Sequence, residues 1–449
     1  MIQKILQRLS PLQIFISGFL LNILIGSILL YLPISAEPGV KVSFIDAIFT
    51  ATSATCVTGL VVQDTAATFS RFGETVIMLS IQIGGLSFMT FSVLLSILLG
   101  KKIGLKERMV IQQAFHNSDL QGLVKLVVSV FTISFIAELI GMILLAIRFV
   151  PDMGISQGTY YALFHSISAF NNSGFDLFGH VHEEFSSLIY YATDPLVNFT
   201  ITALTLTGGI GFLVVIGLIN YPKTRRLSLH VKLTLTVTGL IIAISTVLFL
   251  ILEWNNPHTL GALSLQEKLT VGLFQGSVPR TAGFSTLNAA DSYLPTQMLF
   301  MLVMLIGASP NSTGGGIKTT TIALIYLTVW AMIRRKEDIE VFKRRISNDF
   351  MYRALGITMM YFALIPLLTI LLSITETQNF NVILFEAVSA AGTAGLSLGL
   401  TPELSLPGKL FIIVTMFMGR IGPLSLLFAL AHNKTKESIR YPTEPLILG

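Results

Sequence analysis

Apolar residues stand in long runs along this chain, and polar residues fill the segments between the runs. A run of about 18 or more apolar residues is long enough to cross the hydrocarbon core of a bilayer as a helix. Such runs recur throughout the sequence and predict an all-α polytopic membrane protein with eight transmembrane helices. The predicted spans are residues 12–32, 74–99, 124–150, 195–219, 229–252, 297–333, 354–374 and 407–431.

The connections on one side of these spans hold four further apolar segments that are too short to cross. Each short segment ends in a small residue, a glycine and a large apolar residue, and a serine stands six positions before the glycine. The glycines are Gly59, Gly174, Gly283 and Gly395, and the serines are Ser53, Ser168, Ser277 and Ser389. This recurrence indicates four repeated units.

A second mark occurs in the span that follows each short segment. It reads Gly84-Gly85-Leu86, Gly208-Gly209-Ile210, Gly315-Gly316-Ile317 and Gly419-Arg420-Ile421. Together the two marks predict four parallel repeats of helix, re-entrant pore loop and helix around a central pore, with four pore helices. The predicted repeats are residues 1–110, 111–222, 223–345 and 346–449. The alternative is that the glycines only permit close helix packing, which does not explain a short helix ending in glycine in every unit.

Composition and charge agree with a membrane protein. Only 12% of the 449 residues are charged, against about 25% in soluble domains. Of the 29 basic residues, 21 lie before the first span, in or beside the loops 100–123, 220–228 and 334–353, or after residue 431. The positive-inside rule therefore predicts a multi-pass cell-membrane protein with both termini in the cytoplasm. Because topology explains the basic charge, no nucleic-acid partner is expected.

The glycine turns suggest a site for a cation. Backbone that is not helical is tolerated at membrane depth only where protein buries it or water reaches it. A ring of four such turns could direct carbonyl oxygens inward and replace the hydration shell of a monovalent ion, as potassium filters do, whereas Ca²⁺ or Mg²⁺ would demand carboxylates. The nearest charges are Asp176 and Arg280, outside the turns. The candidate K⁺ site consists of the carbonyls of Val57, Thr58, Gly59, Asn172, Ser173, Gly174, Thr281, Ala282, Gly283, Thr393, Ala394 and Gly395.

The span 297–333 is interrupted by Pro310 and three consecutive glycines, and at 37 residues it is too long for one straight crossing. We expect Pro310 to end its first half and Thr319 to Thr321 to restart its second half. The alignment of the repeats places the break level with Arg420, below the filter. The predicted gate consists of Asn311, Gly314, Gly315, Gly316, Lys318 and Arg420. The alternatives are a static kink and an arginine with a purely structural role.

The four imperfect units, the single filter glycine in each and the broken third unit resemble the Trk/Ktr/HKT superfamily of potassium and sodium transporters. The direct start at the first repeat and the short tail are most similar to the membrane subunits of bacterial Ktr potassium uptake systems. The resemblance covers essentially the whole chain. It implies that glycine in all four filter positions accompanies potassium selectivity, and that serine in the first accompanies a preference for sodium. It also implies a homodimer and a cytosolic RCK-type ring that binds nucleotide, so no cofactor is expected in this chain.

No enzyme motif is complete in this sequence. The stretch Gly314 to Thr320 is similar to a nucleotide P-loop, but Ile317 separates its last glycine from Lys318 and no strand precedes it. We therefore expect a transporter and not an enzyme.

Three matters stay open at this point. The chain could conduct sodium or select poorly, because only the first turn approaches the potassium-channel signature. It could be a proton- or sodium-coupled symporter that uses the buried Glu138, although pairing of Glu138 with another buried group is favoured. The basic segments 101–108 and Arg334 to Arg345 either fix topology or contact the regulatory partner.

Overall fold

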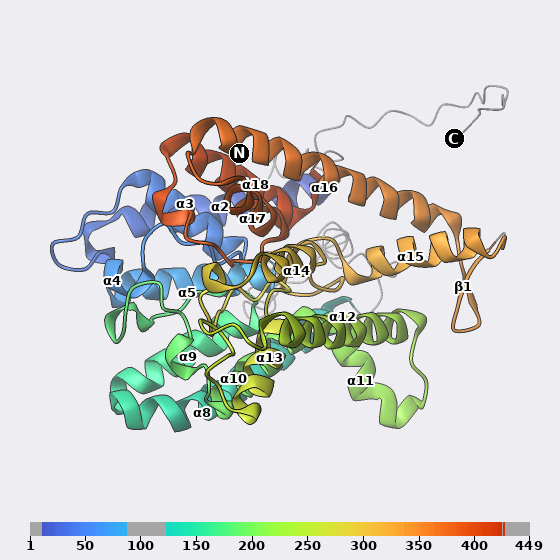
Figure 1. The fold of residues 1–449 in the computed structure, drawn as a ribbon, viewed down its shortest axis with the longest axis horizontal. Coiled ribbons are helices and arrows are strands. Elements are labelled where there is room, and N and C mark those ends of the chain that lie inside the picture. Colours follow the sequence, from blue (N-terminus) through green and yellow to red (C-terminus); the bar gives the residue numbers. More distant parts are fainter. Residues whose placement is uncertain (1–10, 88–122, 337, 424, 427–449) are drawn as a thin grey trace.

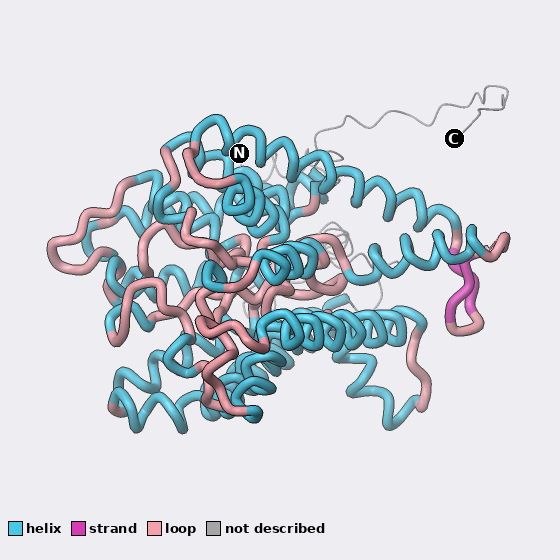
Figure 2. Tube along the Cα trace, in the orientation of Figure 1, coloured by secondary structure: helices cyan, strands magenta, loops and turns pink. Residues whose placement is uncertain are grey.

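The computed structural model describes residues 11–87, 123–336, 338–423, 425 and 426. In this part of the chain the fold is all-helical apart from one short hairpin (Figure 1). Loops gather in the middle of the molecule, between the ends of the helices (Figure 2). The predicted class, an all-α polytopic membrane protein, is confirmed.

The first helix of each predicted repeat is long and apolar on nearly all sides. These four helices are α2 (Pro11–Tyr31), α8 (Leu123–Met153), α12 (Leu229–Glu253) and α16 (Asn348–Thr375). They expose large apolar side chains such as Ile140, Ile244 and Ile370, as expected where a helix faces lipid. Within the described residues these are the four single helices long enough to cross a membrane.

The four short segments form helices that end just before the filter glycines. They are α3 (Phe44–Thr55), α9 (Ile155–Phe170), α13 (Leu265–Ser277) and α17 (Phe380–Gly392). Serine caps fix two of their starts, since Ser43 accepts from the Asp46 amide and Ser264 forms a reciprocal capping box with Glu267. The prediction of four pore helices is therefore confirmed.

The second helix of each repeat is where the predicted spans need correction. The spans 74–99, 195–219 and 407–431 were predicted as continuous. In the described residues, the first helix of each repeat is continuous, whereas the second helix is interrupted. Helix α5 (Arg71–Gly85) ends at its Gly-Gly mark, and residues 88–99 lie outside the described part of the chain. Helices α10 (Pro195–Gly209) and α11 (Phe212–Thr224) meet at 98°. Helix α18 (Leu406–Ile421) ends at Gly422, which has a φ of 89°.

These breaks have a common physical cause. A Cβ atom on Gly84, Gly208 or Gly419 would collide with the last carbonyls of the pore helix of the same repeat, namely those of Thr55, Phe170 and Ala391. Glycine lets the second helix approach the pore helix this closely, and the chain then turns away. The Gly-Gly or Gly-Arg pair by which the repeats were aligned is therefore also the place where the second helix is interrupted.

The third repeat has the largest interruption. Helix α14 (Leu294–Leu305) ends before the glycines, and α15 (Thr319–Ile333) starts after them. Pro310 does not end α14 as predicted, because the helix stops five residues earlier, where Gly307 packs against the backbone of Gly315 and Gly316. The predicted restart at Thr319 is confirmed.

A two-stranded antiparallel hairpin follows α15, at the right edge of Figure 1, and was not predicted. Strands β1 (Ile339–Val341) and β2 (Arg344–Ile346) pair with Ile339 opposite Ile346. Phe342 and Lys343 at the turn both have positive φ, which suits a tight hairpin turn. The basic segment expected to be a loop is thus ordered at its end.

The remaining elements are short and lie in the connections beside the pore helices. They are α4 (Thr65–Thr68), η1 (Pro33–Ser35), η2 (Phe178–His180), η3 (Ile189–Tyr191), η4 (Ala289–Asp291) and η5 (Thr401–Glu403). The apolar core surrounds the pore helices, where the phenylalanines Phe164, Phe170, Phe274 and Phe385 are almost fully buried. The C-terminal halves of the pore helices are therefore held by packing, which fixes the direction of their C-terminal ends.

Candidate functional site

The four predicted filter glycines meet at one place. A Cβ atom added to Gly59 would lie 3.4 Å from the Cα atoms of both Gly174 and Gly395. One added to Gly395 would lie 2.8 Å from the Cα of Gly283, and one on Gly174 would collide with Gly283. The glycines therefore close a ring formed by all four repeats, in which a larger residue has no room.

Backbone carbonyl oxygens lie against the same ring. The carbonyl oxygen of the residue before one filter glycine lies within 3.4 Å of the Cβ position on a glycine of another repeat. These carbonyls belong to Thr58, Ser173, Ala282 and Ala394. The short helices behind them direct the negative ends of their dipoles toward the same region. The ring therefore brings carbonyl oxygens and the negative ends of helix dipoles to one place, an arrangement whose chemistry suits a cation.

All four turns share an unusual backbone conformation. In each, the glycine and the residue two positions before it are left-handed. The φ angle is 50° at Val57, 57° at Asn172, 65° at Thr281 and 49° at Thr393. Such a conformation costs a non-glycine residue about 1–3 kcal/mol and persists only where the surroundings enforce it. The same strain in four sequence-distant places indicates one shared geometry.

The serines six positions before the glycines hold two of these turns. The Ser53 hydroxyl accepts from the Gly59 amide at 3.1 Å, and the Ser389 hydroxyl accepts from the Gly395 amide at 3.1 Å. In the second repeat the Ser168 hydroxyl instead donates to Phe175 O at 2.7 Å. In the third, Ser277 donates within its own helix. The sequence marked these serines by position, and the structure gives three of them a role in the turns.

The interrupted segment of the third repeat, residues 306–318, lies against side chains of the filter turns. Asn172 Nδ2 donates to Thr313 Oγ1 at 2.7 Å. Cβ atoms on Gly314 and Gly315 would collide with the hydroxyls of Thr281 and Thr393. We call residues 306–318 the gate loop, after the role predicted from the sequence. The alignment of the four repeats predicted that these residues lie near the filter. Their direct contacts with three filter turns were not predicted.

Arg420 joins the gate loop to the first repeat. Its guanidinium donates to Thr313 O, to Gly84 O at 2.6 Å and to Gly85 O at 3.1 Å. The alignment that set Arg420 level with Gly85 therefore agrees with its position. Thr313, which the sequence did not single out, bonds to Arg420 and Asn172 at once; its place directly before the three glycines was the available signal.

Two other predicted gate residues have contacts inside or beside the gate loop. Lys318 Nζ donates to Gly314 O at 2.7 Å and to Gly315 O at 3.4 Å. Asn311 has a φ of 57°, and its carbonyl accepts from the Phe212 amide at 2.8 Å. The amides of Ser309 and Thr313 donate to Gly209 O and Gly208 O. The loop is thus fastened to the bend between α10 and α11.

Glu138 accepts hydrogen bonds from neutral side chains, which agrees with the prediction that it pairs with another buried group. It is 6% exposed. Gln82 Nε2 donates to both of its carboxylate oxygens at 3.0 and 3.1 Å, and Asn171 Nδ2 lies 3.3 Å from one of them. Since Asn171 follows the second pore helix directly, this group of three side chains supports the second filter turn.

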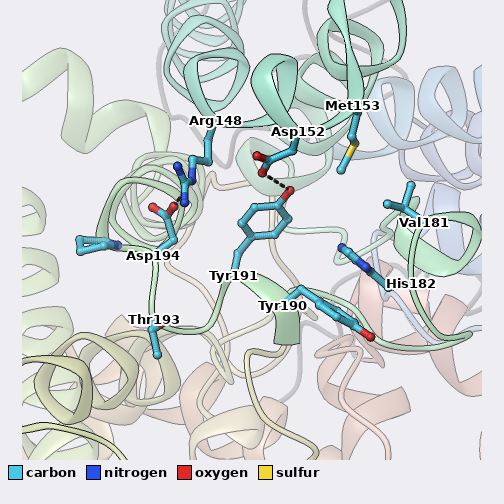
Figure 3. Close-up of a pocket in the computed structure, with 10 residues that line it drawn as sticks. Arg148, Asp152, Met153, Val181, His182, Tyr190, Tyr191, Thr193 and Asp194 are labelled. Carbon is cyan, nitrogen blue, oxygen red and sulfur yellow. Dashed lines mark hydrogen bonds and ion pairs between the residues drawn. The ribbon is translucent and has the colours of Figure 1, made fainter.

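A cavity of about 430 Å³ lies away from the ring, between the end of α8 and the connection that precedes α10 (Figure 3). Two interactions connect the segments that line this cavity. Arg148 forms an ion pair with Asp194, and Tyr191 donates a hydrogen bond to Asp152 at 3.0 Å. His182 stacks on Tyr190 with ring centroids 3.5 Å apart. Arg148, near the end of α8, thus ties this helix to the connection that precedes α10.

The fold and this site define a polytopic membrane protein in which four re-entrant loops meet on one axis. Residues 10–439 match the family model described as TrkH, cation transport protein. The chain belongs to the TrkH family of cation transport proteins, and is accordingly a multi-pass membrane transport protein and not an enzyme.

Several relatives match over nearly their whole length. The chain is 46% identical over 443 residues to "Ktr system potassium uptake protein B" of Bacillus subtilis, covering 98% of this chain and 97% of that protein. It is 36% identical over 453 residues to "Potassium/sodium uptake protein NtpJ" of Enterococcus hirae, covering 100% and 99%. The crystal structure of the potassium transporter TrkH from Vibrio parahaemolyticus has the same fold, with a TM-score of 0.69 at 20% identity over 93% of this chain and 85% of that one.

Proposed function

We propose that this chain is the potassium-conducting membrane subunit of a Ktr-type uptake system. The observation that carries the proposal is the ring of four glycines, with the carbonyl oxygens of the residues before them packed against it. Uncharged carbonyl ligands suit a weakly hydrated monovalent cation. The relative of highest quoted identity is named as a potassium uptake protein, which supports potassium as the ion.

In this proposal the filter consists of the twelve residues of the four turns. Potassium passes down its electrochemical gradient and exchanges water for the carbonyls of Thr58, Ser173, Ala282 and Ala394. The left-handed residues hold those carbonyls inward before the ion arrives, so little reorganisation is needed. Because every turn is closed by glycine, the ring excludes side chains from the ion path.

The gate loop blocks the path below the filter. Gly314 and Gly315 lack side chains, which lets the backbone come against Thr281 and Thr393. Arg420 ties the loop by its bond to Thr313 O and adds a positive charge that opposes a cation there. Lys318 donates to a carbonyl within the loop. This contact suits a residue that anchors the loop better than one that competes with the passing ions. Opening requires the loop to leave this position, and a static kink is the rival account.

Control of the gate is assigned to a cytosolic, nucleotide-binding RCK-type ring that contacts the side predicted to be cytoplasmic. The exposed basic hairpin, with Arg344 and Arg345, is a suitable contact because it extends from α15, the helix that follows the gate loop. A pull on the hairpin would act along α15 on the loop. The chain would work as a homodimer with one pore in each copy.

A second candidate is a transporter that also conducts sodium. It is favoured by the 36% identical relative named as a potassium/sodium uptake protein. A symporter that uses Glu138 has less support, because Gln82 and Asn171 occupy its carboxylate oxygens.

The test is ⁸⁶Rb⁺ uptake by the full chain in liposomes, with and without the cytosolic ring, in competition with K⁺ and Na⁺. Competition by K⁺ far stronger than by Na⁺, with uptake that needs the ring and nucleotide, is the expected result. Equal competition would favour the second candidate. Uptake that vanishes when the proton gradient is collapsed at fixed voltage would favour the symporter.

A further inference from the structure

Glu386 lies on the fourth pore helix, α17, and the conduction path described above gives it no role. Its side chain is fully buried, at 0% exposure. Among the described residues, none of the ion pairs includes it. A carboxylate in a protein interior is costly unless hydrogen bonds replace the lost water. The hydrogen-bond partners of Glu386 therefore indicate what the buried acid does.

Both carboxylate oxygens accept hydrogen bonds from the segment that follows Gly395. Ser397 Oγ donates to Oε2 at 2.7 Å, and Thr401 Oγ1 donates to Oε1. The Ser397 hydroxyl accepts in turn from the Gly399 amide at 3.1 Å. Thr401 is 2% exposed and begins the short helix η5. One buried carboxylate therefore fastens residues 397–401 to the pore helix.

The same pore helix also holds the filter glycine itself. Ser389, three residues after Glu386, accepts from the Gly395 amide at 3.1 Å. Residues three apart lie on the same face of a helix. The fourth turn is left-handed at Thr393 and at Gly395, with φ angles of 49° and 86°, and such a conformation persists only where the surroundings enforce it. One helix face thus holds this turn at its glycine and again just after it.

Two other repeats have weaker contacts of the same kind. In the second, the Leu177 amide donates to His165 Nε2 at 3.4 Å. In the third, Gln275 Nε2 donates to the hydroxyls of Ser285 and Thr286 at 3.4 Å each. A bond between the pore helix and the segment after the glycine therefore recurs in three repeats. The fourth repeat has a shorter bond, and a carboxylate makes it, which is the stronger type of hydrogen bond.

We propose that Glu386 is a positioning residue for ion selection, which acts through Ser397 and Thr401 without touching the ion. By holding residues 397–401, the carboxylate fixes the direction in which the chain leaves Gly395, and with it the place of the Ala394 carbonyl in the ring. A carbonyl free to move closer coordinates the smaller Na⁺ better, so loss of this restraint should favour Na⁺. The inference rests on the proposed potassium conduction.

The test removes one hydrogen-bond donor while Glu386 stays in place. Thr401→Val keeps the shape of the side chain but loses its hydroxyl, whereas Thr401→Ser keeps the hydroxyl. The measurement is the ratio of K⁺ to Na⁺ concentrations that halve ⁸⁶Rb⁺ uptake by the full chain in liposomes. Thr401→Val should shift this ratio toward Na⁺ by at least about threefold, and Thr401→Ser should keep the wild-type ratio. Ser397→Ala removes the second donor and should act in the same direction.

Glu253→Gln is the matched control for the loss of a buried carboxylate. Glu253 is also 0% exposed and accepts from the side chains of Asn256, Thr259 and Thr296, but it lies at the end of α12 and not on a pore helix. Its replacement should lower the melting temperature and leave the ion ratio unchanged. Glu386→Gln should shift the ratio, because an amide offers one acceptor oxygen to two hydroxyl donors.

Ion binding is measured separately, as the rise in melting temperature of the purified protein with K⁺ or Na⁺. Thr401→Val should reduce the preference of this rise for K⁺ over Na⁺, and Thr401→Ser should not. Variants that lose stability but keep the wild-type preference in both measurements would overturn the proposal. A wild type that K⁺ stabilises but that takes up no ⁸⁶Rb⁺ would contradict potassium conduction, while the melting data would still decide the role of Glu386.

Discussion

The side-chain amide of Asn172 donates a hydrogen bond of 2.7 Å to the hydroxyl of Thr313, a residue 141 positions further along the chain. The Thr313 hydroxyl in turn lies 3.1 Å from Phe170 O, at the end of the second pore helix. The residue that begins the second filter turn is thus bonded to the gate loop. Any displacement of the loop must break this bond, which connects the filter to the gate.

Replacing Thr313 with valine should raise the basal flux of ⁸⁶Rb⁺ in the absence of the cytosolic ring. Valine has nearly the same shape but cannot bond to Asn172 or Phe170. The closed position loses about 1–3 kcal/mol, which corresponds to a rise in the open population of about five- to 150-fold while that population is small. Thr313→Ser keeps the hydroxyl and should behave as the wild type. Equal basal flux in both variants would show that the bond does not hold the loop.

Arg420→Gln should have a similar effect for a different reason. The substitution removes a charge and three hydrogen bonds to carbonyls of two repeats. Basal uptake should rise at least about tenfold, and control by the nucleotide-bound ring should weaken. Arg420→Lys keeps the charge with fewer bonds and should lie between the two. A well-folded Arg420→Gln protein with unchanged basal uptake would assign the arginine a structural role only.

Gly315→Ala should displace the gate loop by steric contact. The new Cβ would meet the Thr393 hydroxyl and lie 3.1 Å from its Cγ2. Because rotation of Thr393 exchanges one collision for another, the loop must shift, and basal uptake should rise several-fold. Gly356→Ala, where nothing lies within 4 Å, is the matched control. The double variant with Thr393→Ala restores the space and should return uptake toward the wild-type level; failure of this rescue would contradict the contact.

The connection between α9 and α10 should lose stability in acid. Burial lowers the pKa of His182 from its ordinary value of 6.5, so the unfolded chain binds the proton more readily than the folded one. The associated stability is present above about pH 6.5 and is lost as the pH falls below it. His182→Phe keeps a ring against Tyr190 and should reduce the difference in melting temperature between pH 8 and pH 5.5. The exposed His258→Phe should leave that difference intact, and an unchanged pH dependence in His182→Phe would exclude this origin.

The sequence was sufficient for the class of fold, because apolar run length and charge asymmetry follow directly from the solvent properties of a bilayer. The pore helices were also predictable, since a short apolar segment before Gly59 or Gly395 cannot cross a membrane. Their C-terminal ends followed from the glycine that must come after, whereas the serine caps of Ser43 and Ser264 were not predicted. The predicted limits of the four repeats remain a prediction.

The breaks in the second helices were harder to foresee. Gly84 and Gly419 are tolerated inside ordinary helices, and only the close approach of a pore-helix carbonyl turns them into ends. For the same reason the span 195–219 was predicted as one helix, although the chain bends by 98° after Gly209. Contacts such as Asn172 with Thr313 depend on how distant repeats pack, which local patterns do not encode.

The central claim is that the four-glycine ring selects the ion, and Gly59→Ser tests it most directly. Gly59 has a φ of 91°, and a side chain there would collide with the carbonyl of Ser173. Gly39 has a similar φ of 88° but open space around it, so Gly39→Ser controls for backbone strain alone. The measurement is the ratio of K⁺ to Na⁺ concentrations that halve ⁸⁶Rb⁺ uptake. Gly59→Ser should shift the ratio toward Na⁺ by about tenfold, or about 1.4 kcal/mol, while Gly39→Ser leaves it unchanged. An unaltered ratio in serine variants of all four filter glycines would contradict the account.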